Sequence, residues 1–381
     1  MNGSADISAT VALRRELHAH AELAGREIET SRILRTYVEG HGPQQLITDL
    51  GGCGLAAVFD GREDGPTLMF RTEIDAVPVQ EVNDFDHRSR HAGVSHKCGH
   101  DGHAATVAGL AAGLASRPLS RGRVVLLFQP AEETGCGARD VLEDERFESI
   151  EPDWIFALHN LPGEPLGEIQ VKSGPFAAGS VGLILKLEGR TSHAAYPEQG
   201  RSPATAVAQL IQELTVLPAA LVRGSEIARV TVVHARIGEP AFGTTPGHAE
   251  VMATLRSDQE EVLERLRTES VKRLKRIARA NALEHSYSWT DDFPVTANDP
   301  EAVGVIEAVA ESRGVTVSRR DVAYPWSEDF GWFTRRFRGA IFGLGSGLGH
   351  PALHSPDYDF PDELIPIGLG IFEGIIERLV G

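Results

Sequence analysis

The stretch DGHAATVAGLAAGLASRPLSRGRVVLLFQPAEE (residues 101–133) decides the fold class, because it joins a helix pattern to a strand pattern. Residues 101–116 are mostly small and apolar, which predicts a helix that is apolar almost all round and therefore buried. Residues 123–133 form a short apolar run that ends in two acidic residues, which is typical of a buried strand. A buried helix that leads into a buried strand predicts an α/β layer structure.

Two segments on either side repeat the strand design. PTLMFRTEID (66–75) ends in Asp75, and DWIFALHN (153–160) carries His159 near its end. Ligands of open α/β sheets gather beyond the carboxyl ends of the strands. We therefore expect the chemically active side chains at one edge of a central mixed sheet, between two layers of helices.

The middle of the chain has a different order of elements. Its apolar patterns predict β-α-β-β-α-β, the split βαβ or ferredoxin-like unit. The expected elements are a strand at 181–189, a helix at 202–217, strands at 228–238 and 248–257, a helix at 258–280 and a strand at 284–291. Asp258 is the predicted N-cap of the second helix, with Glu261 three positions on.

A chain of 381 residues exceeds the usual size of one core, so two domains are expected. We predict an α/β/α domain whose first part is 1–177 and whose second part is 293–381. The α+β unit at 178–292 is predicted to be inserted between them.

Composition limits the partners and the location. The formal net charge of −17 repels phosphate backbones and anionic lipids, so we expect neither nucleic acid nor a membrane as partner. The N-terminus has no apolar core of a signal peptide, and no stretch approaches the ~20 apolar residues of a membrane span. Three cysteines without CxxC spacing do not suit a disulfide scaffold. These features predict a cytoplasmic protein.

Five side chains in loops after the expected strands are candidate metal ligands. They are Cys98, His100, Glu133, His159 and His354. Five ligands are too many for one tetrahedral structural zinc, but they match two divalent ions if one ligand is shared. A thiolate can bridge two cations, so Cys98 is the expected shared ligand. The helix N-terminus near Asp101 is expected to favour its anionic form.

Glu132 stands beside Glu133, and two adjacent carboxylates can divide their duties. While Glu133 binds metal, Glu132 can accept a proton from an attacking water, which is hydrolytic chemistry. Asp75 is expected to hydrogen-bond a histidine ligand and fix its tautomer. His103 is expected to be a hydrogen-bonded core histidine, and His96 a solvated loop residue.

Seven motifs in this sequence resemble those of one metallohydrolase family. They are FRTEIDAVPVQE (70–81), HKCGHDGHAA (96–105), LLFQPAEE (126–133), ALHNLP (157–162), GRTSHAAYPEQG (189–200), SEDFGWF (327–333) and LHSPDYDF (353–360). The chain resembles the aminoacylase and carboxypeptidase family of co-catalytic metallopeptidases, in its amidohydrolase branch. That branch includes hippurate hydrolases, auxin-conjugate hydrolases and N-acetyl-diaminopimelate deacetylases. The resemblance runs from the N-terminal helix almost to the C-terminus.

This resemblance implies a metal-dependent amide hydrolase of N-acyl amino acids or similar small conjugates. It implies the five ligands named above, two divalent ions (Zn, Mn, Ni or Co), and Glu132 as the general base. It also implies that the inserted unit is a lid that mediates homodimer contacts. On lid closure, His193 would help to stabilise the oxyanion.

Three departures from the branch limit what can be transferred. Gly243, followed by Thr244 and Thr245, stands where the lid usually has a substrate-binding Asn. Glu73 replaces the common Asp, and Lys97 replaces the common Ala and is expected to add a cation near the metal mouth. Arg256 has two open interpretations, either as a ligand of a substrate carboxylate or as part of a lid salt bridge.

Three alternative functions remain open at this point. A small-peptide exopeptidase or dipeptidase would use the same metal site. A thiol hydrolase would use Cys98 as nucleophile and His100 as base, and would survive a chelator. A non-catalytic binding protein is disfavoured by Glu132 and by the complete set of ligands.

Overall fold

The computed structural model describes residues 7–222 and 227–381, and the chain divides into two compact units. Unit 1 holds the described residues up to Phe176, together with Ala297–Asp321 and Asp329–Gly381. Unit 2 holds Ala177–Thr296 and Val322–Glu328. Each unit has its own hydrophobic core.

Unit 1 is built on a mixed sheet of eight strands in the order β1-β2-β4-β3-β5-β16-β6-β15. The strands are β1 (Gln45–Leu50), β2 (Gly54–Asp60), β3 (Glu63–Glu73), β4 (Arg121–Gln129), β5 (Trp154–Pro162), β6 (Ile169–Val171), β15 (Val317–Arg319) and β16 (Arg338–Gly347). The four central strands β4, β3, β5 and β16 are parallel, whereas β1 and β2 are antiparallel additions at one side. The carboxyl ends of the parallel strands therefore meet at one edge, as the apolar runs predicted.

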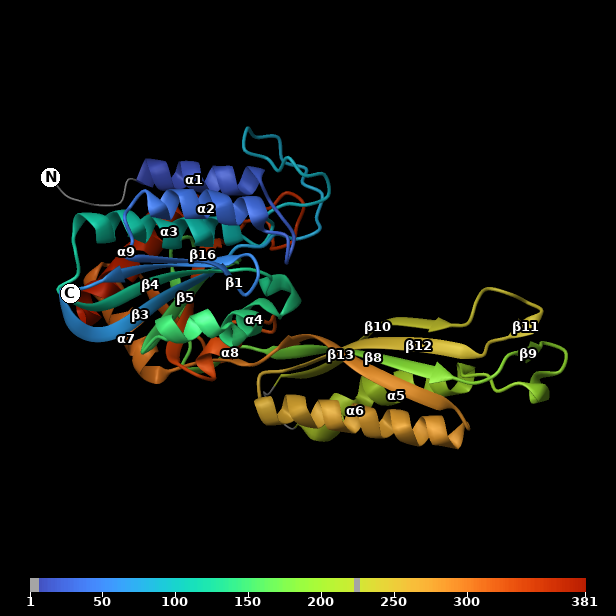
Figure 1. The fold of residues 1–381 in the computed structure, drawn as a ribbon. Coiled ribbons are helices and arrows are strands. Elements are labelled where there is room, and N and C mark those ends of the chain that lie inside the picture. The colour runs from blue at the N-terminus through green and yellow to red at the C-terminus, as the bar shows by residue number, and fades with distance from the viewer. Residues whose placement is uncertain (1–6, 223–226) are drawn as a thin grey trace. The chain divides into compact units, whose positions relative to one another are not determined.

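Helices cover both faces of this sheet (Figure 1). The first face carries α1 (Ile7–Ala19), α2 (Ile28–Glu39), α3 (His100–Ser116), α7 (Pro300–Ser312) and α9 (Leu364–Leu379). The second carries the short helices α4 (Gly137–Glu143) and α8 (Gly331–Thr334). Helix α3 is buried on nearly all sides between β3, β4, β5, α1 and α9, as its small apolar residues predicted.

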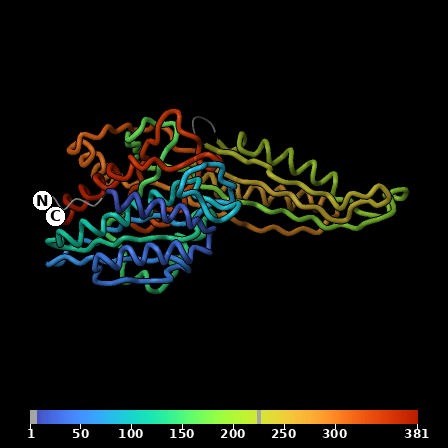
Figure 2. Tube along the Cα trace, turned by 90° about the horizontal axis from the view of Figure 1, so that it is seen from above, coloured from blue at the N-terminus to red at the C-terminus, as the bar shows by residue number. Residues whose placement is uncertain are grey.

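Unit 2 contains a four-stranded antiparallel sheet in the order β10-β12-β8-β13. Its elements along the chain are β8 (Gly179–Glu188), α5 (Ala204–Leu221), β10 (Ala228–Ile237), β12 (His248–Ser257), α6 (Glu260–Ala280) and β13 (Glu284–Phe293). Figure 2 shows these strands side by side along their length. The short strands β9 (Ser192–His193) and β11 (Thr244–Thr245) form a separate two-stranded ribbon.

Two details of unit 2 differ from the sequence expectations. Asp258 does not cap α6: the N-cap is Gln259, and the Asp258 carboxylate accepts a hydrogen bond from the Ile227 N–H at 2.9 Å instead. Helix α5 has 18 residues with a mean hydropathy of 1.3, enough to match a membrane span by length and composition. Leu210, Leu214 and Leu217 of this helix lie in the core of unit 2, and 28% of the helix is buried in the structure, so one such helix is weak evidence for a membrane span.

Candidate metal centre

The edge at which the parallel strands end collects the predicted side chains of unit 1. Asp75 follows β3, Glu132 and Glu133 follow β4 in a 3-10 turn (Glu132–Thr134), and His159 lies within β5. Cys98 and His100 come from the segment that enters α3, and His354 from the loop after β16. Residues from separate parts of the chain meet here because four parallel strands bring the loops at their carboxyl ends to one edge of the sheet.

The distances place all five predicted ligands in one cluster. One ligand atom each of Cys98, Glu133 and His354 lies within 4.8 Å of the others, and so do those of His100, Glu132 and Glu133. The Cys98 Sγ is 3.6 Å from His159 Nε2, which connects the fifth residue. Glu133 belongs to both groups, so the geometry offers a carboxylate as well as the Cys98 thiol for a shared position.

The histidine tautomers are set by main-chain oxygens. The His100 Nδ1 lies 2.9 Å from the Asp75 carbonyl oxygen, and the His159 Nδ1 lies 2.8 Å from the Asn160 carbonyl oxygen. Both bonds leave Nε2 directed into the cluster. The Asp75 carboxylate lies 3.3 Å from the same His100 nitrogen and accepts the Glu133 N–H at 2.9 Å. Asp75 therefore orients both a histidine and the carboxylate loop.

Two buried polar atoms of the cluster test whether these residues suit a cation. The His100 Nε2 and the Glu133 Oε1 have no hydrogen-bond partner among the described residues, although both are buried. They lie 3.9 Å apart, and His354 Nε2 is 3.4 Å from the same Glu133 oxygen. Buried polar atoms without a hydrogen-bond partner are costly unless another group satisfies them, and sulfur, imidazole and carboxylate ligands suit divalent transition metals. The residues therefore fit a metal centre.

The electrostatics of the cluster agree with this assignment. Burial alone would lower the pKa of His100, but Asp75, Glu73 and Glu133 raise this pKa to about 10. Burial lowers the pKa of His159 to about 3, so its imidazole is neutral, which is the form that binds metals. Strongly shifted pKa values within one buried cluster are typical of a functional site.

The expectation of an anionic Cys98 is wrong for the protein without cations. Burial and the carboxylates of Glu133, Glu132 and Glu73 raise the pKa of Cys98 well above its usual value. These carboxylates outweigh the helix N-terminus, so the thiol stays protonated until a cation displaces the proton. A buried thiol with a raised pKa is also a poor nucleophile, which disfavours the thiol hydrolase.

Glu132 is buried and has a backbone donor on one side. Its Oε1 accepts the Asp329 N–H at 3.3 Å, and its Oε2 lies 4.0 Å from His100 Nε2. The Asp329 carboxylate binds Arg71 at 2.5 Å, and Gln129 and the Ala138 N–H as well. The motif SEDF thus supplies a residue that holds the Glu132 loop, a role that its acidic character alone did not reveal.

The neighbouring histidines differ in how well the sequence predicted them. His103 is buried as expected, with Nδ1 2.9 Å from Glu73 and Nε2 2.5 Å from the Asn160 side chain. The expectation of a solvated His96 is wrong, since only 1% of its surface is exposed. The loop before α3 turns inward beside α1, where the His18 and His96 rings lie 6.1 Å apart.

Lys97 also differs from expectation, because its side chain is fully buried. It forms an ion pair with Glu81, and its Nζ donates to the Tyr358 carbonyl oxygen at 2.7 Å. Its charge is therefore neutralised in the interior. Neither Glu81 nor Tyr358 stood out in the sequence, although both lie within the conspicuous motifs that end β3 and carry His354.

The predicted residues of unit 2 belong to its own surface and loops. His193 lies on β9 opposite Thr244, is exposed, and accepts the Ala195 N–H at Nδ1 over 3.0 Å. Arg256 on β12 donates to Ser327 at 2.6 Å, and no carboxylate pairs with it in the described part of the chain. The salt-bridge interpretation of Arg256 therefore has no support.

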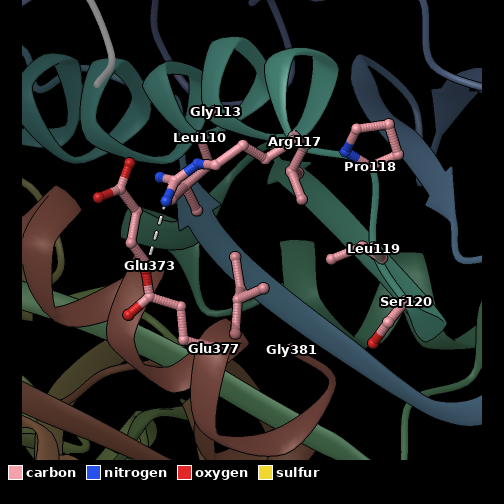
Figure 3. A pocket seen from close by; sticks show the side chains of 11 residues that line it. Leu110, Gly113, Arg117, Pro118, Leu119, Ser120, Glu373, Glu377 and Gly381 are labelled. Atoms are coloured by element: carbon pink, nitrogen blue, oxygen red, sulfur yellow. Dashed lines mark ion pairs between the residues drawn. The ribbon is translucent and has the colours of Figure 1, made fainter. Parts of the chain in front are cut away.

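A separate pocket in unit 1 does not coincide with this cluster. It lies at the C-terminal end of α3, the opposite end from His100, and has a volume of about 220 Å³ (Figure 3). Leu110, Leu114 and Ile376 contribute its apolar wall, and Arg117 faces Glu377 at 3.6 Å across it. None of the predicted site residues lines it.

Comparisons with known proteins agree with the geometry. Residues 69–378 match the sequence profile of peptidase family M20/M25/M40. The chain is 29% identical to the N-acetylcysteine deacetylase of Bacillus subtilis (strain 168) over 361 residues, covering 94% of each protein. It is 28% identical to the N-acetyldiaminopimelate deacetylase of Listeria innocua over 372 residues, covering 96% of this chain and 98% of that protein.

Solved structures share the fold over nearly the whole chain. The YxeP protein of Bacillus subtilis, a dinuclear metal-binding peptidase of the M20 family, superposes with a TM-score of 0.82 at 28% identity and covers 98% of both chains. A protein of methicillin-resistant Staphylococcus aureus gives a TM-score of 0.89 at 22% identity, covering 100% of this chain and 98% of that one, which shows the fold.

Proposed function

Because the chain belongs to peptidase family M20/M25/M40, we propose that it cleaves the amide bond of N-acyl amino acids or similar small conjugates with two divalent metal ions. The relatives named as deacetylases of acetylated amino acids support this substrate class. The observation that carries the proposal is the convergence of five ligand side chains, two of which have a buried atom (His100 Nε2 and Glu133 Oε1) without a hydrogen-bond partner among the described residues.

We assign the metal ligands as Cys98, His100, Glu133, His159 and His354. Bound divalent ions would polarise the amide carbonyl and lower the pKa of water. Zn, Mn, Ni and Co all remain candidates, because sulfur, imidazole and carboxylate donors suit each of them.

Glu132 is the proposed general base. It would accept the proton of the attacking water on Oε2 and then deliver it to the leaving amine. Its Oε1 accepts the Asp329 N–H, which helps to fix the orientation of the carboxylate. Asp75 would keep the His100 tautomer and the Glu133 backbone in place.

Unit 2 is the proposed lid. We propose a ferredoxin-like domain at 178–292, inserted between the two parts (1–177 and 293–381) of the catalytic domain, and the β-α-β-β-α-β order supports it. His193 would donate from Nε2 to the oxyanion when the lid closes, since its Nδ1 already accepts the Ala195 N–H. Arg256, which is half-buried and donates to Ser327, would bind the substrate carboxylate.

We further propose a homodimer through the lid domain and a cytoplasmic location. The edge strand β10 supports the first, because it exposes Val233 and Ile237 at one side of the sheet. The three free cysteines support the second.

One experiment tests the mechanism and separates the rivals. The metal-loaded protein is assayed on N-acetyl and N-benzoyl amino acids and on dipeptides, before and after chelation. We expect hydrolysis of N-acyl amino acids that chelator abolishes and added metal restores. Preference for dipeptides would instead identify the exopeptidase, and activity that survives chelation would identify a thiol enzyme.

Substitution of the base completes the test. Glu132→Gln is expected to keep both metal ions and the fold while lowering kcat about 10²–10⁴-fold, the usual contribution of a general base. Glu148→Gln, a change at an exposed glutamate of the same unit, is the matched control. Unchanged turnover of Glu132→Gln with full metal content would contradict the mechanism.

A further inference from the structure

We propose that Lys97 is a positioning residue that holds the His354 loop in the geometry needed for metal binding. The inference rests on the proposed role of His354 as a ligand. The Lys97 Nζ donates to the main-chain oxygen of Tyr358 at 2.7 Å, and the whole side chain is buried. A cation that donates to a carbonyl inside the protein forms a stronger bond than a neutral donor does.

The backbone of Lys97 holds the other end of the same loop. The His354 N–H donates to the Lys97 carbonyl oxygen at 2.7 Å. His354 has a φ of +62°, in the left-handed region that residues other than glycine rarely occupy. Such a conformation persists only where the surroundings impose it. Lys97 therefore binds residues 354 and 358, the two ends of the turn that presents the imidazole.

Tyr358 extends this connection to the strand that carries His159. Its hydroxyl is hydrogen-bonded by the side chain of Asn160, which directly follows His159. The Tyr358 ring is fully buried, so movement of its backbone would disturb packing at the end of β5. The Lys97 ammonium thus stabilises the position of a residue that contacts both ligand loops.

Glu81 fixes the ammonium in this place. Its carboxylate pairs with Lys97, lies 3.0 Å from His18 Nε2 and accepts the Ser89 N–H at 2.7 Å. These three contacts hold the Glu81 carboxylate in place. Its negative charge neutralises the Lys97 ammonium inside the protein. Removal of the lysine alone would leave a buried carboxylate short of one partner, so a stability loss by itself would not prove positioning.

The test uses cobalt as a spectroscopic probe. The metal-free protein is titrated with Co²⁺, and the visible spectrum and chelator competition report the affinity for each ion. Wild type is expected to bind two Co²⁺ ions, one with thiolate character. Lys97→Met, which keeps the length and loses the charge, is expected to bind one of the two ions about 10–100-fold more weakly, the usual effect of an altered outer-shell partner.

Two further variants separate positioning from simple stability. Glu81→Gln/Lys97→Met removes both charges, and we expect it to regain thermal stability while keeping the weakened Co²⁺ affinity. This double variant also carries the test if Lys97→Met does not fold. In a His354→Ala background, Lys97→Met should cause no additional loss, because the two changes act on the same ligand. Lys186→Met, at an exposed lysine of unit 2, is the control.

Each result decides the question. Three results would each contradict the role of Lys97: wild-type Co²⁺ affinity in Lys97→Met, recovery of Co²⁺ affinity together with stability in the double variant, or additive losses of affinity with His354→Ala. In each of these cases, binding of two ions by the wild type would leave the proposed function standing. A wild-type protein that binds no Co²⁺ would overturn both.

Discussion

Gly243 lies beside the proposed oxyanion residue His193, at a position where a side chain could be added without altering the fold. Its carbonyl oxygen accepts the Ala194 N–H at 2.9 Å, next to His193. A Cβ at this position would meet no atom within 4 Å, and the backbone is not in the left-handed region. Glycine is therefore not required by the structure, and a side chain would project freely.

We predict that Gly243→Asn folds like wild type and binds N-acyl amino acids more tightly. One added hydrogen bond to the substrate carboxylate should lower KM about threefold to tenfold. Steady-state kinetics provide the measurement. Substrates whose carboxylate is amidated are the control, and an equal improvement for those substrates would contradict the explanation.

Asp329 is predicted to be essential for stability rather than for chemistry. Its carboxylate faces Arg71 at 2.5 Å, and both side chains are fully buried. Asp329→Asn leaves the Arg71 guanidinium with Glu73 as its remaining buried carboxylate partner, so the free energy of unfolding should fall by about 1–3 kcal/mol. Chemical denaturation measures it. Asp321→Asn, at an exposed position, is expected to change the same quantity by less than about 0.5 kcal/mol.

The sequence predicted these residues unequally, for a physical reason. His159 and Glu133 could be brought together in advance, because the ends of parallel strands meet at one edge. Neither the burial of His96 nor the pairing of Lys97 with Glu81 could be predicted. Both depend on how the irregular segment between β3 and α3 folds back, and no periodic pattern marks that path.

At the scale of elements, two glycines of α3 differ in how closely the rest of the chain packs against them. A Cβ at Gly102 would lie 2.3–2.4 Å from the Phe360 ring, which is rigid and buried. A Cβ at Gly113 would approach only the Glu373 carboxylate, at 3.3 Å, and that side chain can move. The packing in α3 therefore requires glycine at position 102 but not at position 113.

We predict opposite outcomes for two alanine substitutions in α3. Gly102→Ala should lower the free energy of unfolding by about 1–3 kcal/mol through overpacking. Gly113→Ala should leave it unchanged or raise it by up to about 1 kcal/mol through helix propensity. Denaturant titration of both variants tests the pair. Equal effects would mean that the Phe360 contact does not limit the helix.

The presence of helices and strands was predictable where apolar periodicity is strong, whereas the residues at which the helices begin were harder to predict. The pattern located β12 (His248–Ser257) to the residue, because alternate side chains face the core of unit 2. The start of α6 was misplaced, because Asp258 has a tertiary partner in the Ile227 N–H that outweighs local capping. The order of strands, with β3 between β4 and β5, depends on long-range pairing that no single segment records.

At the scale of the molecule, the two-part organisation was visible in the change of element order near residue 178. The sequence did not reveal that residues Val322–Glu328 belong to unit 2, although they lie far along the chain from the other residues of that unit. They are held there by bonds such as that of the Ala178 N–H to the Tyr324 carbonyl oxygen at 3.0 Å. Non-local hydrogen bonds of this kind leave no signal in a short window of sequence.

The distribution of ligands between the units gives the last prediction. All five proposed ligands belong to unit 1, so metal binding should stabilise that unit selectively. At a metal concentration 100-fold above Kd, one bound ion adds about 2.7 kcal/mol to its stability. Hydrogen exchange of the protein with and without chelator measures this. Amides of β3, β4 and β5 should exchange faster after chelation, whereas those in the core of unit 2, such as β8 and β12, should not change. Equal acceleration in both units would mean that they unfold together, and faster exchange in unit 2 alone would place the metal elsewhere.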